Sequence, residues 1–107
     1  MAKFTLTDLE KRIAERAEAG AAQSYTRTLL DKGVAHAAKK MGEEAFETAI
    51  AAVQEDKGRL IAEASDLVYH LLVVLKARGV TLADVEAELD KRTAQSGHEE
   101  KAARAKS

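Results

Sequence analysis

The sequence predicts an all-α protein, because its composition and its lack of helix breakers both favour long helices. Charged residues make up 33% of the 107 residues, and no proline interrupts the chain. Alanine, leucine, glutamate and lysine, which are strong helix formers, dominate. The length suits one hydrophobic core. We therefore predict a single domain over residues 1–107, in which about 96–107 form a charged C-terminal helix or tail.

The first half of the sequence predicts three segments of unequal helical strength. A capping-box spacing at Thr7–Glu10, followed by apolar residues at helical intervals, predicts a helix over about 7–19. Residues 20–33 are more polar and bounded by glycines, which predicts a loop with a brief helix. Small apolar residues then predict a long helix over about 34–55. Its apolar stripe consists of Ala37, Met41, Ala45, Ala49 and Ala52.

The second half predicts a central helix and a shorter one. After a turn at residues 56–58, residues 59–77 are apolar nearly all round, which predicts a buried central helix. The pair Val73–Val74 also suits a strand, but no turn signal precedes it, so the strand is the lesser alternative. Residues 81–93 predict an amphipathic helix, and residues 96–99 repeat the capping-box spacing. The short connections predict antiparallel neighbours.

The charge balance and the absence of cysteine exclude several classes of function. With 17 basic and 18 acidic residues the net charge is −1, which offers no positive field for a nucleic acid. Without cysteine, only histidine and carboxylates remain as metal ligands. The N-terminus shows no signal-peptide pattern, and the longest apolar run, residues 71–75, is too short to span a bilayer. We expect a cytoplasmic protein with neither nucleic-acid nor membrane partner.

Acidic residues gather on one face of each long predicted helix. At about 100° per residue, each set occupies one sector of its helix. The first set is Lys40, Glu43, Glu44 and Glu47, and the second is Glu63, Asp66 and His70. Alone, the first set also fits a solvated face with an ordinary Lys40–Glu44 pair. The second lies on a helix with little surface for water, and its carboxylates therefore need a partner such as a hard divalent cation.

A hairpin of the two long helices would bring both acidic faces together. Glu47 would lie opposite Asp66, with Glu44 near His70 and Glu63 one turn nearer the hairpin. This oxygen-only set suits one or two Mg²⁺ ions, or Mn²⁺ as a substitute, and Mg²⁺ is usually shared with substrate phosphates. A di-iron bundle would need a Glu-x-x-His pair on each of two helices, which these faces do not carry. We therefore predict a phosphorylated substrate.

Residues 39–47 and 63–70 carry a family resemblance. They read KKMGEEAFE and EASDLVYH, and Glu-Glu-x-x-Glu followed by Glu-x-x-Asp resembles the MazG-like all-α nucleotide pyrophosphohydrolases. Residues 24–26, 69–70 and 92–101 extend the likeness to the phosphoribosyl-ATP pyrophosphatases of histidine biosynthesis. The resemblance implies a MazG-like helical bundle completed by homodimerisation. It also implies a set of metal ligands, which are Glu44, Glu47, Glu63 and Asp66.

The same resemblance implies a reaction. Phosphoribosyl-ATP would be hydrolysed to phosphoribosyl-AMP and pyrophosphate by Mg²⁺-dependent attack of water on the α-phosphorus. Glu43 would be the general base or would support a metal ligand. The residues assigned to the substrate are Ser24, Thr26, Arg27, Lys39 and Lys40. Ser24 and Thr26 would hold a second phosphate, and the three cations would offset phosphate charge, although Arg27 and Lys39 also fit ordinary exposed charges.

Other interpretations remain open at this point. A housecleaning nucleoside triphosphate pyrophosphohydrolase would share the metal motif but not the narrower likeness. A non-enzymatic helical dimerisation module would explain the apolar helix but not the acids facing it. We interpret His70 as a core histidine hydrogen-bonded to a neighbouring carboxylate rather than as a metal ligand. His36 and His98 are expected at the surface.

Overall fold

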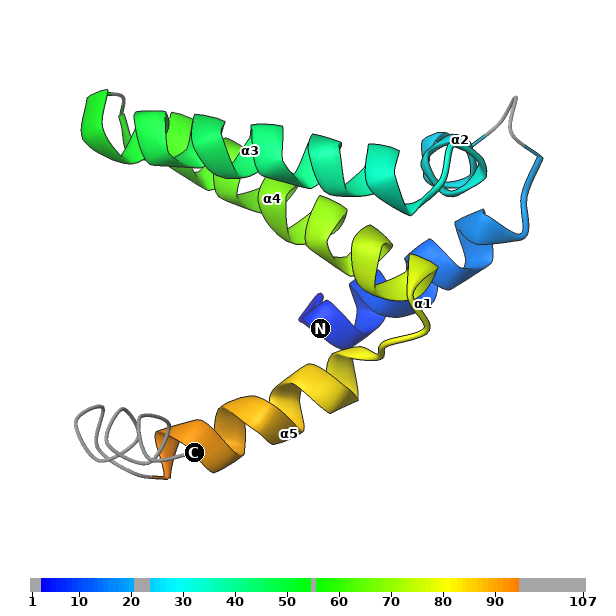
Figure 1. The fold of residues 1–107 in the computed structure, drawn as a ribbon. Helices are drawn as coiled ribbons and strands as arrows, with labels where there is room; N and C mark the ends of the chain where they lie inside the picture. The colour runs from blue at the N-terminus through cyan, green and yellow to red at the C-terminus, as the bar shows by residue number, and fades with distance from the viewer. Residues whose placement is uncertain (1–2, 21–23, 55, 95–107) are drawn as a thin grey trace.

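The computed structural model describes residues 3–20, 24–54 and 56–94. These residues form α-helices and no strand, which confirms the all-α prediction and rejects a strand at Val73–Val74 (Figure 1). The helices are α1 (Leu6–Ala17), α2 (Tyr25–Asp31), α3 (Val34–Gln54), α4 (Lys57–Ala77) and α5 (Leu82–Thr93). The C-terminal helix or tail expected at 96–107, like His98, lies outside the described residues.

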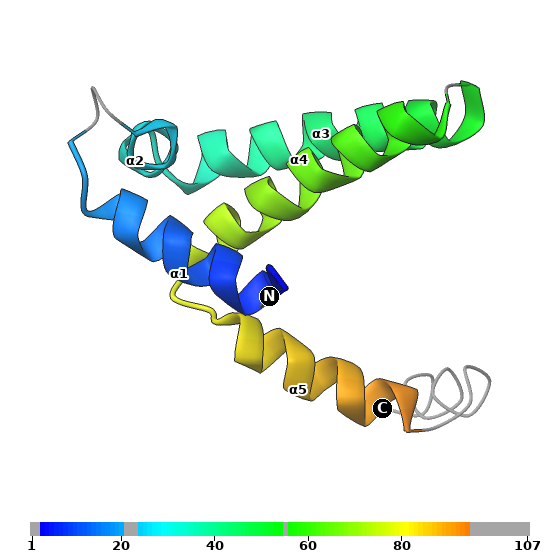
Figure 2. The ribbon, with the colours of Figure 1, turned by 180° about the vertical axis from the view of Figure 1, so that it is seen from behind.

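The long helices α3 and α4 run antiparallel as a hairpin that organises the molecule. α1 and α2 pack at the end of the hairpin where α3 begins and α4 finishes, so the tip of the hairpin projects away from them (Figures 1 and 2). α5 contacts α1 and leads away from the same end. This end holds the hydrophobic core, to which all the described helices contribute. Its buried members are Ile13, Leu29, Ala37, Leu72, Val73 and Leu82.

Two helix starts differ from the prediction because the capping residue differs. Thr5, and not Thr7, caps α1, since its hydroxyl accepts from the Asp8 N–H at 3.2 Å and the Asp8 carboxylate accepts from the Thr5 N–H at 2.9 Å. Asp56 caps α4 by accepting from the Arg59 N–H at 2.8 Å. Residues 57 and 58 therefore belong to the helix and not to the turn, which makes the α3–α4 connection shorter than predicted.

The predicted apolar stripe of α3 is buried only in part, and the face that α3 turns towards α4 is the predicted acidic one. Of the expected stripe, Ala37 is buried, but Ala45 and Ala49 are exposed. The inward face instead carries Glu44, Thr48 and the buried Ala51. Alanine occurs on both sides of this helix, so hydrophobic periodicity alone does not distinguish the two faces.

α4 is half-buried in one chain and does not form the enclosed central helix that its composition predicts. Ile61 on α4 is 60% exposed, and on α3 Phe46 is 68% and Val53 82% exposed. These side chains leave an uncovered apolar surface on the projecting part of the hairpin. No helix among the described residues has the length and apolar character needed to cross a membrane.

Candidate metal centre

Three carboxylates from two helices converge in the middle of the α3/α4 hairpin. One side-chain oxygen from each of Glu44, Glu63 and Asp66 lies within 4.8 Å of the others. Oxygen ligands sit about 2.0–2.6 Å from Mg²⁺ or Ca²⁺, so two ligands of one ion lie up to about 4–5 Å apart. The three oxygens are therefore spaced for a single divalent cation.

Glu63 and Asp66 differ in exposure, although both were predicted to be buried. Glu63 is buried, whereas Asp66 is exposed. The reason is that the other described helices do not enclose α4, so Asp66 stays exposed even though one of its oxygens lies within 4.8 Å of oxygens of Glu44 and Glu63. A site built on this pair is open to solvent at Asp66, which gives a ligand a route of entry.

Glu47 stands beside Glu63 and not opposite Asp66. The pKa of Glu63 is raised, first by a hydrogen bond with Glu47, then by burial and by the negative charge of Glu47, while Arg59 lowers it. The register is one turn from the predicted one because Asp56 starts α4 earlier. Arg59 is also an ion-pair partner, with its Nη2 2.7 Å from Glu63 Oε1.

Two buried oxygens of this cluster lack a hydrogen-bond donor in the described part of the chain. They are Glu44 Oε2 and Glu63 Oε2 in their ionised forms. Burial raises the pKa of Glu44, the negative charges of Glu47 and Asp66 raise it further, and His70 and Lys40 lower it. An unpaired buried carboxylate is costly, and a cation would satisfy both oxygens. The hard, oxygen-only donor set fits Mg²⁺ or Mn²⁺.

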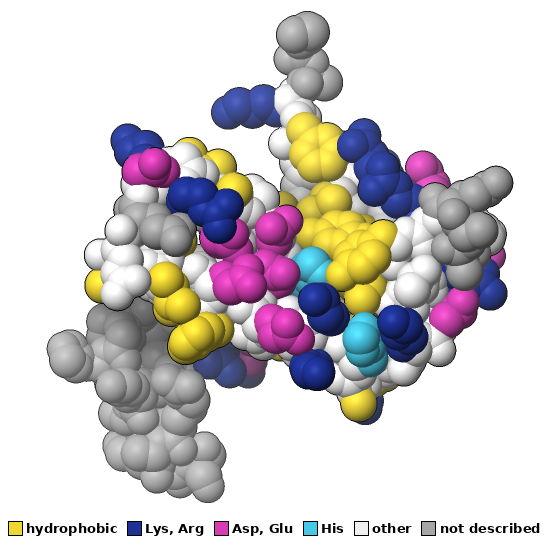
Figure 3. Space-filling model, turned by 90° about the horizontal axis from the view of Figure 1, so that it is seen from above, with side chains coloured by type: hydrophobic (Ala, Val, Ile, Leu, Met, Phe, Trp, Pro, Cys, Tyr) yellow, Lys and Arg dark blue, Asp and Glu magenta, His cyan; other side chains and the backbone are white. Residues whose placement is uncertain are grey.

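The acidic side chains form one patch on the surface, next to lysine and histidine side chains (Figure 3). Glu43 is exposed, and its Oε2 lies 3.8 Å from Lys40 Nζ. The positive charge of Lys40 also lowers the pKa of Glu44, so Lys40 is close to both acids. Lys39 is exposed. Of the two predicted phosphate-binding lysines, the structure thus brings Lys40 to the acids.

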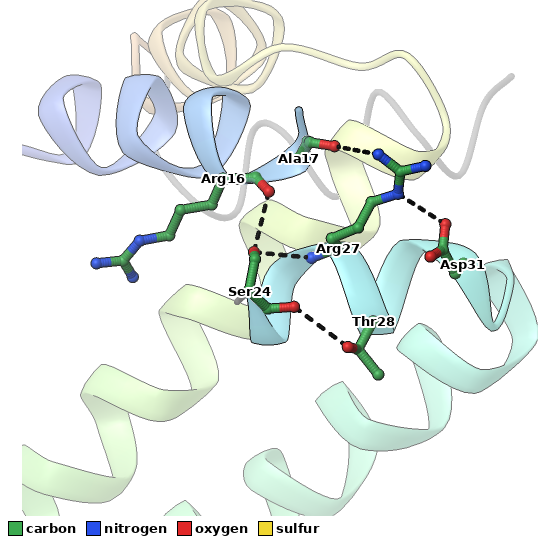
Figure 4. Close-up of polar contacts among 6 residues, drawn as sticks. All are labelled: Arg16, Ala17, Ser24, Arg27, Thr28 and Asp31. Carbon is green, nitrogen blue, oxygen red and sulfur yellow. Dashed lines mark hydrogen bonds and ion pairs between the residues drawn. The ribbon is translucent and has the colours of Figure 1, made fainter. Parts of the chain in front are cut away.

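The side chains of Ser24 and Arg27 connect α2 to α1 through hydrogen bonds. Ser24 Oγ donates to the Arg16 carbonyl at 2.9 Å and accepts from the Arg27 N–H at 3.1 Å (Figure 4). Arg27 Nη1 donates to the Ala17 carbonyl at 3.2 Å, and its Nε lies 2.9 Å from Asp31. Both side chains, predicted as substrate contacts, are engaged at this junction within the chain.

Thr26 fastens α2 to α4. Its side chain is fully buried, and its hydroxyl forms a hydrogen bond with the Tyr69 hydroxyl. Tyr25 stacks on Tyr69 with ring centroids 6.2 Å apart and an interplanar angle of 18°. The predicted segment 24–26 is therefore held against the same helix that carries Glu63 and Asp66.

Tyr25 belongs to the predicted segment 24–26, but its sequence context indicated no role of its own. Its hydroxyl lies 3.1 Å from Nε2 of the buried His70, and His70 Nδ1 lies 2.7 Å from the main-chain carbonyl of Asp66. His70 thus bonds a carbonyl and a tyrosine and not the carboxylate that we predicted. The two partners are 45 residues apart, and no local pattern in the sequence indicates that they meet.

Comparisons with known proteins identify the family. The family model of phosphoribosyl-ATP pyrophosphohydrolase matches residues 6–93. Phosphoribosyl-ATP pyrophosphatase 1 of Bradyrhizobium diazoefficiens is 62% identical, covering 97% of this chain and 98% of its own length. The phosphoribosyl-ATP pyrophosphatase of Azorhizobium caulinodans is 59% identical, covering 98% and 96%. The chain belongs to the phosphoribosyl-ATP pyrophosphohydrolase family.

Proposed function

We propose that this chain hydrolyses phosphoribosyl-ATP to phosphoribosyl-AMP and pyrophosphate in histidine biosynthesis, with Mg²⁺ as cofactor and Mn²⁺ as a substitute. The observation that carries the proposal is the group of three carboxylate oxygens within 4.8 Å, two of whose residues also hold buried oxygens without a donor. The family and the names of its relatives supply the substrate. We place this reaction of a small nucleotide in the cytoplasm.

We assign different roles in the reaction to different residues of the hairpin. Glu44, Glu63 and Asp66 hold the cation, with Glu47 as a fourth carboxylate beside Glu63. A bound Mg²⁺ supplies positive charge for the phosphate oxygens and makes water a better nucleophile. Water attacks the α-phosphorus, the bond to the pyrophosphate oxygen breaks, and pyrophosphate leaves. We assign the proton from water to Glu43, which is exposed and 3.8 Å from Lys40.

The basic and hydroxyl residues take two different roles. Lys40 forms an ion pair with Glu43 at 3.8 Å and its charge lowers the pKa of Glu44, so we assign its ammonium to offset the charge of a substrate phosphate. Lys39 is exposed and adjacent to Lys40 in the sequence, and we assign it a second positive charge for the substrate phosphates. The hydrogen bonds of Ser24, Thr26 and Arg27 support an indirect role, in which they hold α2 beside the site.

We propose further that the working form is a homodimer. The exposed Phe46, Val53 and Ile61 on the α3/α4 hairpin support this, because large exposed apolar side chains mark association surfaces when they gather on one side, and Phe46 and Val53 lie two turns apart on one side of α3. Sedimentation of the wild-type chain and of Val53→Glu tests the assignment, with Leu89→Glu on α5 as the control. A wild-type chain that sediments as a monomer at micromolar concentration would reject it.

The central test of function is pyrophosphate release from phosphoribosyl-ATP with Mg²⁺, beside a panel of common nucleoside triphosphates. We expect strong preference for phosphoribosyl-ATP and, in ¹⁸O water, label in the monophosphate product. Equal or better turnover of a deoxynucleotide would move the chain to the housecleaning pyrophosphohydrolases. Label in pyrophosphate would reject attack at the α-phosphorus, and the absence of any turnover would favour a non-enzymatic dimerisation module.

A further inference from the structure

A potential nitrogen ligand lies at the border of the carboxylate cluster. His70 follows Asp66 by one helical turn on α4, where its side chain is buried, and its Nδ1 lies 2.7 Å from the main-chain carbonyl oxygen of Asp66. Histidine is the commonest metal ligand in proteins. Even so, the three ligand atoms within 4.8 Å of one another are all carboxylate oxygens, from Glu44, Glu63 and Asp66.

Two hydrogen bonds occupy both nitrogens of His70. The Asp66 carbonyl can only accept, so the Nδ1 at 2.7 Å from it carries the proton and donates. In the neutral ring Nε2 then holds the only available lone pair, and the Tyr25 hydroxyl at 3.1 Å donates to it. A metal ion would need that same lone pair. While the Tyr25 bond exists, His70 therefore has no free nitrogen to offer.

The Tyr25 hydroxyl is held in place by its surroundings. The Tyr25 ring stacks on Tyr69 and meets the His70 ring edge-on, with centroids 6.2 and 5.8 Å away. On either side of Tyr25, Ser24 caps α2 and the buried Thr26 bonds to Tyr69. Although Tyr25 is 51% exposed, these ring contacts and the attachment of α2 to α4 position its hydroxyl at His70.

The identity of the donor atoms decides which cation such a site prefers. Carboxylate oxygens suit Mg²⁺ and Mn²⁺, whereas an added imidazole nitrogen favours Co²⁺, Ni²⁺ and Zn²⁺, which already bind most sites more tightly than Mn²⁺ does. We propose that Tyr25 is a metal-selectivity residue, whose hydroxyl occupies Nε2 of His70 and so keeps the imidazole from joining Glu44, Glu63 and Asp66. This inference rests on the proposed function, because it assumes a cation at those carboxylates.

The test compares Tyr25→Phe with Tyr69→Phe in the full chain. Each change removes one hydroxyl and keeps the ring, but only the first frees His70, since the Tyr69 hydroxyl bonds to Thr26. Binding of Mn²⁺ is measured by electron paramagnetic resonance of the free ion, and binding of Co²⁺ by its visible absorption. We expect Tyr25→Phe to raise the affinity for Co²⁺ relative to Mn²⁺ by about 10-fold or more, as changes around metal ligands often do. Tyr69→Phe should leave the ratio unchanged.

Substitutions of His70 make the test specific. Adding His70→Gln to Tyr25→Phe should remove the gain, and a gain that persists would overturn the inference because another ligand must then cause it. His70→Gln alone should leave the ratio as in the wild type, and this variant can still overturn the inference if Tyr25→Phe does not fold. A 10-fold loss of Co²⁺ affinity in His70→Gln would show that the imidazole already ligates, which would also overturn it.

The controls separate this inference from the proposed function. If the wild-type chain binds Mn²⁺ and Asp66→Asn weakens that binding, the carboxylate site stands. An unchanged ratio in Tyr25→Phe would then overturn the selectivity role alone. If the wild-type chain binds no Mn²⁺ that depends on Asp66, both the proposed cofactor and the selectivity role are overturned.

Discussion

The α3/α4 hairpin contains two regions of opposite character. At the end near α1 and α2, the buried Ala37 and Val73 pack with residues of every other described helix. In the middle, the same two helices bring Glu44, Glu63 and Asp66 together, with two buried oxygens that lack a donor. Burial of an apolar side chain contributes roughly 1.5–3 kcal/mol to folding. Neighbouring carboxylates instead repel each other and lose hydration.

This difference separates the source of stability from the source of chemistry. Apolar packing at the core end holds the helices together. The repulsion among the carboxylates in the middle can therefore persist until a cation binds. Ligand binding stabilises a folded protein in proportion to its affinity and concentration, and a Mg²⁺ site is usually weak. The two regions should therefore respond differently to the same perturbation.

Removal of metal is expected to give the largest difference between the regions. Excess EDTA should abolish pyrophosphate release, because the acidic middle then lacks its charge partner. The helical signal in circular dichroism should persist, since the core end needs no metal. Added Mg²⁺ in excess over the chelator should restore activity. Undiminished turnover in EDTA would contradict the metal assignment.

Asp66→Asn should reduce kcat/KM by at least about 100-fold, since even residues that only support metal ligands typically cost 10–100-fold. The change removes the charge of one converging carboxylate but almost no volume. The matched control is Asp90→Asn, which makes the same change at an exposed position on α5. Steady-state kinetics with circular dichroism would show whether activity falls while the fold remains. A loss of only a few-fold would exclude Asp66 as a ligand.

A cavity made in the hydrophobic core at this end of the hairpin should lower the stability of the protein. Leu29 is 1% exposed on α2, and Leu29→Ala should lower the free energy of unfolding by about 2–5 kcal/mol, as buried Leu→Ala changes do. The control is Leu89→Ala on α5, where the side chain is 54% exposed and the loss should be small. Urea denaturation measures both. Equal losses would mean that the core does not lie where the packing of Leu29 places it.

The sequence predicted the regular parts of both regions and missed the contacts that join them. The described helices, the break at Gly33 and the break at Gly79 follow from local signals, and both glycines have the positive φ, 95° and 69°, that favours glycine. The convergence of acids from α3 and α4 follows from helical periodicity and a short turn. These features depend on residues close together in the chain.

The predictions were wrong where the same local sequence pattern fits two different helix registers or packing arrangements. The register of Glu47 depended on whether the turn or α4 contains residues 57–58, and the cap at Asp56 decided it. The burial of the apolar stripe on α3 was overestimated because alanine lies on both sides of this helix. The bond from Tyr25 to His70 spans 45 residues and depends on how α2 packs against α4. Local patterns carry no information on such packing.

The smallest expected effect is on the stability of the metal-free protein, and it depends on pH. Burial first, and then the charges of Glu47 and Asp66, raise the pKa of Glu44 above its ordinary value of 4.5. The folded protein therefore holds the proton of Glu44 more tightly than the unfolded chain does. The resulting contribution to stability is fully present below about pH 4.5, the unfolded value, and it is lost as the pH rises through the higher folded pKa.

Glu44→Gln should consequently raise the melting temperature of the metal-free protein at pH 7.5, where the half-buried wild-type carboxylate is charged and lies among like charges. At pH 4 the two proteins should melt at nearly the same temperature, because Glu44 is then largely protonated and resembles the amide. The control is Glu86→Gln, which changes an exposed glutamate on α5 and should show no such pH dependence. With saturating Mg²⁺ at pH 7.5 the order should reverse, since only the wild type retains the full ligand charge and gains the larger binding free energy. A Glu44→Gln variant that is less stable than the wild type at pH 7.5 without metal would show that repulsion among the carboxylates does not destabilise the middle of the hairpin. The two regions would then differ only in how well their side chains pack.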